Sequence, residues 1–151
     1  MDKWDERFAR LSLTIAGWSS CFKENRQVGA VIVRDKRILT TGYNGAPTGI
    51  TSCKERGECM RQKLGIESGT RQELCYAVHA EQNALIQAAR LGLSVNGATL
   101  YCTHHPCTIC ARLIVNSGIK RVVYLYSYPD DFSARLLKEG GVEVEKLELG
   151  E

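Results

Sequence analysis

The stretch that decides the fold is residues 98–126, ATLYCTHHPCTICARLIVNSGIKRVVYLY. Residues 98–102 and 120–126 are short apolar runs of strand-forming side chains, and each predicts a β-strand. Between them, Pro106 occupies the favoured first-turn position of a helix that extends to about residue 116 before Gly118. A strand, a helix and a strand in this order form a crossover connection, so the two strands should be parallel in one sheet.

The same alternation continues on both sides of this stretch. Periodic apolar side chains predict a helix at 81–91 with Gly92 as its stop, and another at 132–139 that ends at Gly140. A last strand follows at 142–147. Because helices separate the last three strands, those strands should run parallel, with the helices packed against the sheet.

The first third of the chain predicts a helix followed by a hairpin. Apolar residues recur with a mostly helical rhythm over 4–18, and strands at 28–33 and 38–43 flank a turn at Asp35-Lys36. All the elements together predict an α/β fold with three α/β/α layers. Its mixed five-stranded sheet should begin with an antiparallel hairpin and end in parallel strands.

Length and composition restrict the class of protein. A chain of 151 residues fits a single domain, 1–151, in which 52–78 is a polar, cysteine-containing insertion with at most one short helix. A net charge of only +3 argues against a strongly basic surface, so no nucleic-acid partner is expected. No apolar run reaches about 18 residues. With the charged N-terminus, this predicts a cytoplasmic location and no membrane association.

Two of the expected helices begin with residues suited to holding a metal. His79 and Glu81 open the first in the pattern His-Ala-Glu, and Cys107 and Cys110 open the second in the pattern Pro-Cys-Thr-Ile-Cys. Cysteines three apart in a first turn point to the same side, and a helix N-terminus favours the thiolates that zinc requires. With His79 as the third ligand, the fourth tetrahedral position stays open for water, as in catalytic zinc sites.

Glu81 is the expected catalytic residue. It lies two residues beyond His79, where its carboxylate can take a proton from water without binding the metal. The two motifs together match the H-x-E and P-C-x-x-C signature of zinc deaminases. A structural zinc site or a redox pair of cysteines are the alternatives, but neither explains Glu81 or the open fourth position.

Over residues 28–147 the sequence resembles the deoxycytidylate (dCMP) deaminase family. The segments that carry this resemblance are Val28-Gly29-Ala30-Val31-Ile32, Gly42-Tyr43-Asn44-Gly45-Ala46-Pro47, His79-Ala80-Glu81-Gln82-Asn83-Ala84 and Ser117-Gly118-Ile119-Lys120-Arg121-Val122-Val123-Tyr124.

The resemblance implies a cytidine-deaminase-like fold and the hydrolysis of dCMP to dUMP and ammonia, which supplies thymidylate synthesis. It implies one catalytic Zn²⁺ per chain and a homo-oligomer, with a hexamer favoured. It further implies activation by dCTP and inhibition by dTTP, with Mg²⁺ accompanying the allosteric nucleotide.

Four residues are candidates for substrate contacts. Asn44 lies in a glycine-bordered loop where it could meet a sugar or phosphate, although Asn44-Gly45 also fits a plain tight turn. Arg26 precedes the first strand and could reach a phosphate in the pocket or in a regulatory site, or simply be solvated. Tyr128 stands where the resemblance implies an aromatic ring over the substrate. The alternative is that its ring only packs at the edge of the sheet. Asn83 could bond the ribose or cap local backbone.

Other members of the superfamily remain as alternatives. Free-cytidine deaminases typically use three cysteines and join the last two strands by a hairpin, whereas 132–139 reads as a helix here. tRNA adenosine deaminases share His-Ala-Glu but usually lack the insertion. A deaminase-like protein associated with DNA uptake would keep the zinc site for structure alone, and would have no use for Glu81.

The remaining cysteines suggest a second metal. Cys53, Cys59 and Cys75, with Cys21 as a fourth, flank or lie within an insertion that has too few apolar residues to order itself. We expect them to bind a structural Zn²⁺, which some members of the family carry; reduced cysteines in an ordered loop are the alternative. Cys102, in an apolar strand, reads as a buried small hydrophobe.

Overall fold

A computed structural model describes residues 2–21, 26–67 and 70–150 of the chain. Its centre is a five-stranded sheet in the order β2-β1-β3-β4-β5. The strands are β1 Gly29–Arg34, β2 Arg37–Tyr43, β3 Thr99–His104, β4 Arg121–Tyr126 and β5 Glu143–Lys146. β1 pairs antiparallel with both β2 and β3, whereas β3, β4 and β5 are parallel, so the predicted mixed sheet is confirmed.

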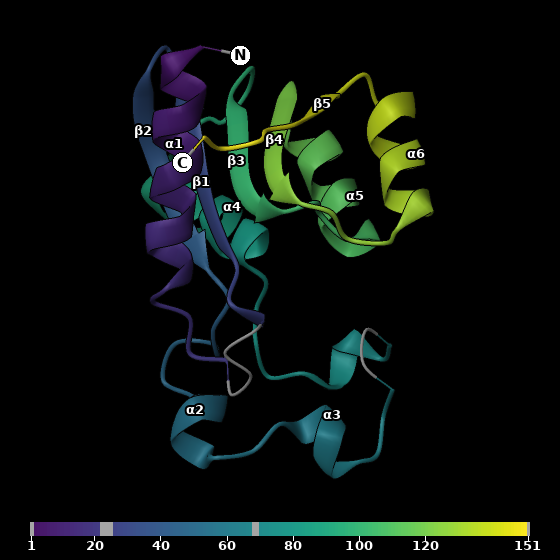
Figure 1. Cartoon of the computed structure of the whole chain (residues 1–151). Helices are drawn as coiled ribbons and strands as arrows, with labels where there is room; N and C mark the ends of the chain where they lie inside the picture. Colours follow the sequence, from purple (N-terminus) through teal and green to yellow (C-terminus); the bar gives the residue numbers. More distant parts are fainter. Residues whose placement is uncertain (1, 22–25, 68–69, 151) are drawn as a thin grey trace.

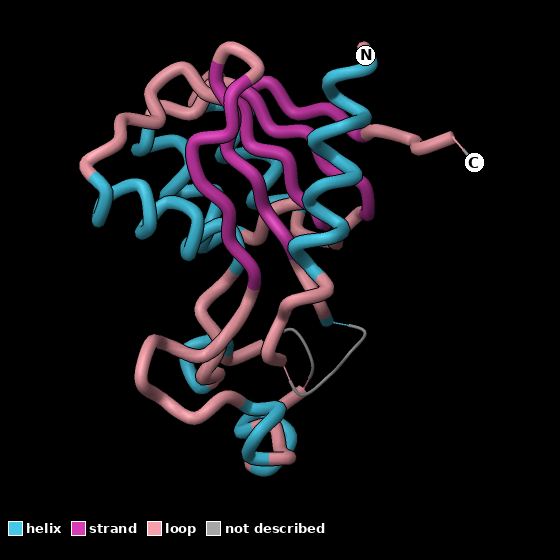
Figure 2. Tube along the Cα trace, turned by 90° about the vertical axis from the view of Figure 1, so that its left-hand side faces the viewer, coloured by secondary structure: helices cyan, strands magenta, loops and turns pink. Residues whose placement is uncertain are grey.

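Helices cover both faces of this sheet, which confirms the three layers (Figures 1 and 2). On one face lies α1 Lys3–Ala16. On the other lie α4 Ala80–Leu91, α5 Thr108–Ser117 and α6 Asp131–Glu139. No helix in the described ranges is both long and apolar enough to cross a membrane.

Each face has its own apolar core. Under α1, the side chains of Phe8 and Ile15 pack against Val31, Tyr101 and Val123 of the sheet. Under α4, α5 and α6, the core is formed by the buried residues Ile32, Ala84, Leu100, Ile114, Val122 and Leu137, among others. Alternate residues of β1 therefore point to opposite cores, as the two-residue period of a strand requires.

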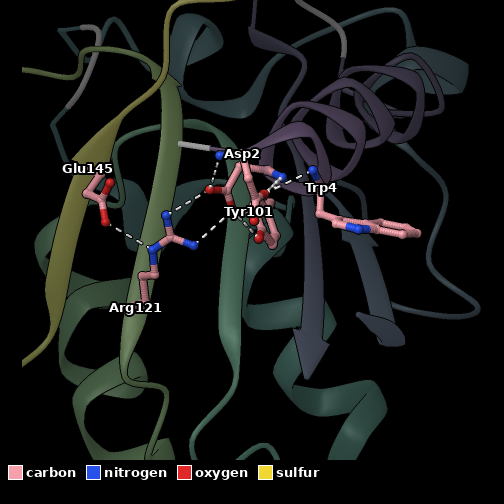
Figure 3. A network of polar contacts seen from close by, with 6 residues as sticks. Asp2, Trp4, Tyr101, Arg121 and Glu145 are labelled. Atoms are coloured by element: carbon pink, nitrogen blue, oxygen red, sulfur yellow. Dashed lines mark hydrogen bonds and ion pairs between the residues drawn. The ribbon is translucent and has the colours of Figure 1, made fainter. Parts of the chain in front are cut away.

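A polar network holds α1 to the sheet (Figure 3). The Asp5 side chain, in a residue only 5% exposed, accepts hydrogen bonds from the Tyr101 hydroxyl at 2.6 Å and from Arg121 at 2.8 Å. Arg121 also donates to Glu145 at 3.0 Å. Since Tyr101, Arg121 and Glu145 stand on β3, β4 and β5, one buried carboxylate links the first helix to the parallel half of the sheet.

Two glycines let helices lie directly on the hairpin. A Cβ on Gly42 of β2 would clash with the carbonyl oxygen of Ala80 and lie 2.6 Å from the amide nitrogen of Ala84. On the opposite face, a Cβ on Gly29 would clash with the carbonyl oxygen of Ser12. The start of α4 is thus fixed by backbone contact with β2, close to the His79 side chain.

The insertion contains more regular structure than expected. The sequence predicts at most one short helix, but two occur, α2 Cys53–Arg56 and α3 Met60–Lys63, followed by the 3₁₀ turn η2 Gln72–Leu74. Helices of four residues bury too little to show an apolar periodicity, so pattern reasoning missed them. Figure 1 shows α2 and α3 beyond the end of the sheet, away from both packed faces.

Candidate metal centre

The three candidate metal ligands stand where two helices begin on the same side of the sheet. His79 is the residue before α4, with an extended backbone, and its amide donates to the side chain of Gln82 at 2.9 Å. Cys107 is the corresponding residue before α5, and Cys110 lies in the first turn of that helix. The chain reaches α5 directly from the carboxyl end of β3, where α/β sheets commonly place their sites.

The three predicted ligands come together. His79 Nδ1 lies 3.3 Å from Cys110 Sγ and 3.4 Å from Cys107 Sγ, and all three ligand atoms are within 4.8 Å of one another. In a tetrahedral zinc site, bonds of about 2.0–2.3 Å separate neighbouring ligand atoms by roughly 3.5–3.8 Å. The donor set and its spacing therefore fit Zn²⁺, with Nδ1 as the histidine ligand.

Hydrogen bonds among Cys107, Cys110 and His79 shift the pKa of each group. A hydrogen bond from the Cys110 thiol, supported by His79, lowers the pKa of Cys107 to about 4. The same bond to Cys107, together with burial, raises the pKa of Cys110, and bonding to Cys107 raises the pKa of His79. A divalent cation at this point would convert the set to two thiolates and a neutral ring, because a coordinating thiol is deprotonated outright.

Glu81 is a buried residue at the cavity beside the candidate ligands. The residue is 5% exposed, and burial raises the pKa of its carboxyl group. A raised pKa makes a carboxylate a better proton acceptor, which favours general acid–base work. Its side chain shares a hydrogen bond with Cys110, which places it at the edge of the ligand set.

A cavity of about 610 Å³ opens over this centre. Such a volume is in the range of small-molecule sites. His79, Glu81 and Cys107 line one part of it, and Arg26, Asn44 and Tyr128, three of the four candidates for substrate contacts, line it as well. The cavity is also lined by His104 and His105.

Asn44 connects the cavity wall to the backbone. Its side-chain oxygen accepts from the amide of Val28 at 2.9 Å, and its amide nitrogen donates to the carbonyl oxygen of Arg26 at 2.7 Å. Both ends of the Asn44 side chain thus hold the segment that carries Arg26, whose positive charge lowers the pKa of His104 after the larger effect of burial.

Asn83 is not brought to this cavity. It donates to the carbonyl oxygen of Tyr43 at 2.8 Å and lines a separate cavity with Gln87 and Arg90. His79 precedes the helix and has an extended backbone, so the helical rule that places residues four apart on one face does not apply to this pair.

The four cysteines of the expected second metal site surround one part of the large cavity. Cys21, Cys53, Cys59 and Cys75 all line it, and the other three thiols add to the effect of burial in raising the pKa of Cys53. They are therefore neighbours. Among the described residues, however, the only set of three or more ligand atoms all within 4.8 Å of one another is that of His79, Cys107 and Cys110.

Residues that sequence reasoning missed come from the insertion and from the start of α6. Arg61 and Gln72 line the cavity, and the Gln72 amide donates to the Tyr128 hydroxyl at 3.3 Å. At α6, the Asp130 carboxylate caps the helix by accepting from the amide of Ser133 at 3.0 Å. The cap has a signal in the sequence, an Asp just before a helix; the insertion residues have none.

Comparisons with known proteins agree with this geometry. Residues 2–126 match the model of the cytidine and deoxycytidylate deaminase zinc-binding region. The deoxycytidylate deaminase of Schizosaccharomyces pombe is 42% identical over 93% of this chain, which spans only 43% of that relative. That of Mycobacterium phage D29 is 45% identical over 80% of this chain and 93% of its own length.

A solved structure shares the whole fold. The dCMP deaminase of cyanophage S-TIM5, determined in complex with dCMP and dUMP, superposes with a TM-score of 0.80 at 32% identity. The match covers 97% of this chain and 99% of that one.

Proposed function

Because this chain belongs to the cytidine and deoxycytidylate deaminase family, we propose that it hydrolyses the exocyclic amine of dCMP, releasing dUMP and ammonia. The observation that carries the proposal is a buried carboxyl group, Glu81, beside a His-Cys-Cys set inside a nucleotide-sized cavity. Relatives named deoxycytidylate deaminase, at 42% and 45% identity, support dCMP as the substrate.

Different residues bind the metal and transfer the protons. His79, Cys107 and Cys110 hold Zn²⁺, which when bound lowers the pKa of a water molecule to about 7. Glu81 accepts one proton from the attacking water and passes it to the ring nitrogen N3; it then takes the second proton from the hydroxyl group added at C4 and delivers it to the departing amine, which leaves as ammonia while C4 becomes a carbonyl. Its burial supports this role, because desolvation raises the pKa of the carboxyl group and so favours uptake of the proton.

The wall of the cavity orients the nucleotide. We propose that Tyr128 packs over the base and that Arg26 and the Asn44 loop border the sugar and phosphate. Their position around the cavity of His79 and Glu81 supports these contacts. The bonds from Asn44 to Val28 and Arg26 hold this wall in place.

The substrate is tested by ammonia release from dCMP, CMP, dCTP and cytidine under identical conditions. The proposal expects the highest kcat/KM for dCMP. If dCMP is the poorest of the four, the assignment within the superfamily is wrong, and cytidine as the best substrate would favour a free-nucleoside deaminase.

Assembly and regulation follow from the same family. We propose a homo-oligomer, with a hexamer favoured, in the cytoplasm, activated by dCTP with Mg²⁺ and inhibited by dTTP. Exposed apolar side chains on α4 and α5 support association between copies of the chain. They are Ile86, Leu91, Ile109 and Leu113. Light scattering gives the oligomer number, and the substrate panel repeated with dCTP and dTTP gives the response to effectors.

We also propose that the four cysteines around the insertion bind a second, structural Zn²⁺. Their shared position along the cavity, and the influence of the other three thiols on the pKa of Cys53, support this site. Closing on an ion would move the sulfur atoms nearer to one another and would stiffen the insertion.

A further inference from the structure

The insertion contributes a cation to the wall of the catalytic cavity. Arg61, on α3, lines the same space as His79 and Glu81 although it lies far from both in the sequence. We propose that Arg61 binds the 5′-phosphate of the substrate and thereby makes the site selective for a nucleotide over a nucleoside. The inference rests on the proposed function, because it names the group that recognises part of that substrate.

The guanidinium of Arg61 is held in place but incompletely bonded. One terminal nitrogen, Nη1, donates to the carbonyl oxygen of Thr70 at 3.0 Å, which fixes the side chain across the insertion. Its Nε is buried and has no hydrogen-bond partner in the ranges that the structure describes. A buried donor without a partner is costly, so a ligand that draws the guanidinium toward the cavity would gain by supplying the missing acceptor.

The chemistry of this donor selects an anion. Arginine stays charged at any physiological pH and presents several N–H groups in one plane, a geometry that matches the oxygens of a phosphate. A nucleoside offers only neutral acceptors, which gain less from a guanidinium than a phosphate does. Glu81 is the acid that lines the same cavity, and in the described ranges no ion pair joins it to Arg61.

The insertion is also linked to the substrate wall. Gln72, on η2, donates to the Tyr128 hydroxyl, so the segment that carries Arg61 and Thr70 meets the ring proposed to cover the base. The Oε1 atom of Gln72 is likewise buried without a partner among the described residues. The insertion therefore presents two polar side chains to a ligand that extends beyond the base.

Equilibrium binding of dUMP and deoxyuridine tests this inference without turnover. The two ligands differ only in the phosphate, and calorimetry on the zinc-loaded full chain gives both affinities. The variant is Arg61→Gln, which removes the charge. Lys63→Gln is the matched control, because Lys63 is an exposed cation on the same helix that pairs with Glu58 at 3.6 Å and does not line the cavity.

For Arg61→Gln we expect dUMP affinity to fall about ten-fold or more, with deoxyuridine affinity unchanged and neither altered by Lys63→Gln. Equal weakening of both ligands, unchanged dUMP affinity, or a wild-type protein with no preference for dUMP would each overturn the inference. Failure of the wild-type protein to release ammonia from dCMP would instead refute the proposed reaction. The binding experiment would still decide whether Arg61 binds the phosphate.

Discussion

Asp130 and Thr108 join α5 to α6. The Asp130 carboxylate accepts from the backbone amide of Thr108 at 2.8 Å and from its hydroxyl at 2.7 Å. On the other side of Cys107, the Ser133 hydroxyl donates to the carbonyl oxygen of Pro106 at 2.6 Å. The start of α6 thus holds the residues immediately before and after Cys107, a proposed metal ligand.

Replacing Asp130 with Ala should therefore weaken zinc binding. Partners that orient metal ligands typically contribute 10–100-fold to affinity, and we expect a loss of about ten-fold here. Competition with a chromophoric chelator measures it. Asp131→Ala is the matched control, because Asp131 is the exposed next residue of the same helix and should leave affinity unchanged. Equal affinities for the two variants would contradict this role.

The close approach of β2 and α4 at Gly42 predicts that Gly42→Ala weakens zinc binding. The added methyl group must push the start of α4 away from β2, at a cost of typically about 1–3 kcal/mol, and His79 immediately precedes that helix. Gly29→Ala should destabilise the protein similarly, but through α1, which carries no ligand. Urea unfolding and chelator competition should show comparable stability losses and a zinc defect in Gly42→Ala alone. A zinc defect of equal size in both variants would mean that the helix start is not the cause.

Asp5 predicts how stability depends on pH. Its hydrogen bond from Arg121 lowers the pKa of the Asp5 carboxyl group below the ordinary value. The folded state therefore holds this proton less tightly than the unfolded chain does. The resulting stabilisation is complete above the unfolded pKa of about 4 and is lost as pH falls through the folded pKa.

The test is Asp5→Asn in urea unfolding at neutral and acidic pH. Removing the charge from a hydrogen-bonded pair costs about 1.5–3 kcal/mol, so the variant should lose stability on that scale at neutral pH and show a shallower acid dependence. Glu6→Gln, an exposed acid on the same helix, is the control. An unchanged acid dependence in Asp5→Asn would show that other carboxyl groups dominate.

The proposed structural zinc predicts the metal content. Elemental analysis of the wild-type protein should give two zinc ions per chain, and Cys59→Ser should give one. Cys102→Ala is the control, because Cys102 is buried in β3 away from the insertion and should leave the content at two. One zinc per chain in the wild-type protein, unchanged by Cys59→Ser, would refute the second site.

The sheet and the metal centre were predictable because each has a local signal. Strand and helix periods alternate over residues 98–147, and helix starts fix where Cys107 and Cys110 point. The insertion was not predictable in detail, because its internal structure includes single polar contacts such as Arg61 to Thr70, which leave no periodicity. Asn83 shows a different limit: its neighbours depend on whether His79 lies inside the helix or before it.

The central claim is that Glu81 moves protons beside a zinc ion held by His79, Cys107 and Cys110. The most direct measurement is the rate of ammonia release from dCMP by zinc-loaded Glu81→Gln, which keeps the size of the side chain but cannot take up a proton. We expect the rate of ammonia release to fall by about 100-fold or more. The variant should keep the same zinc content as the wild-type protein. A Glu81→Gln protein that keeps its zinc and the wild-type rate would contradict the account.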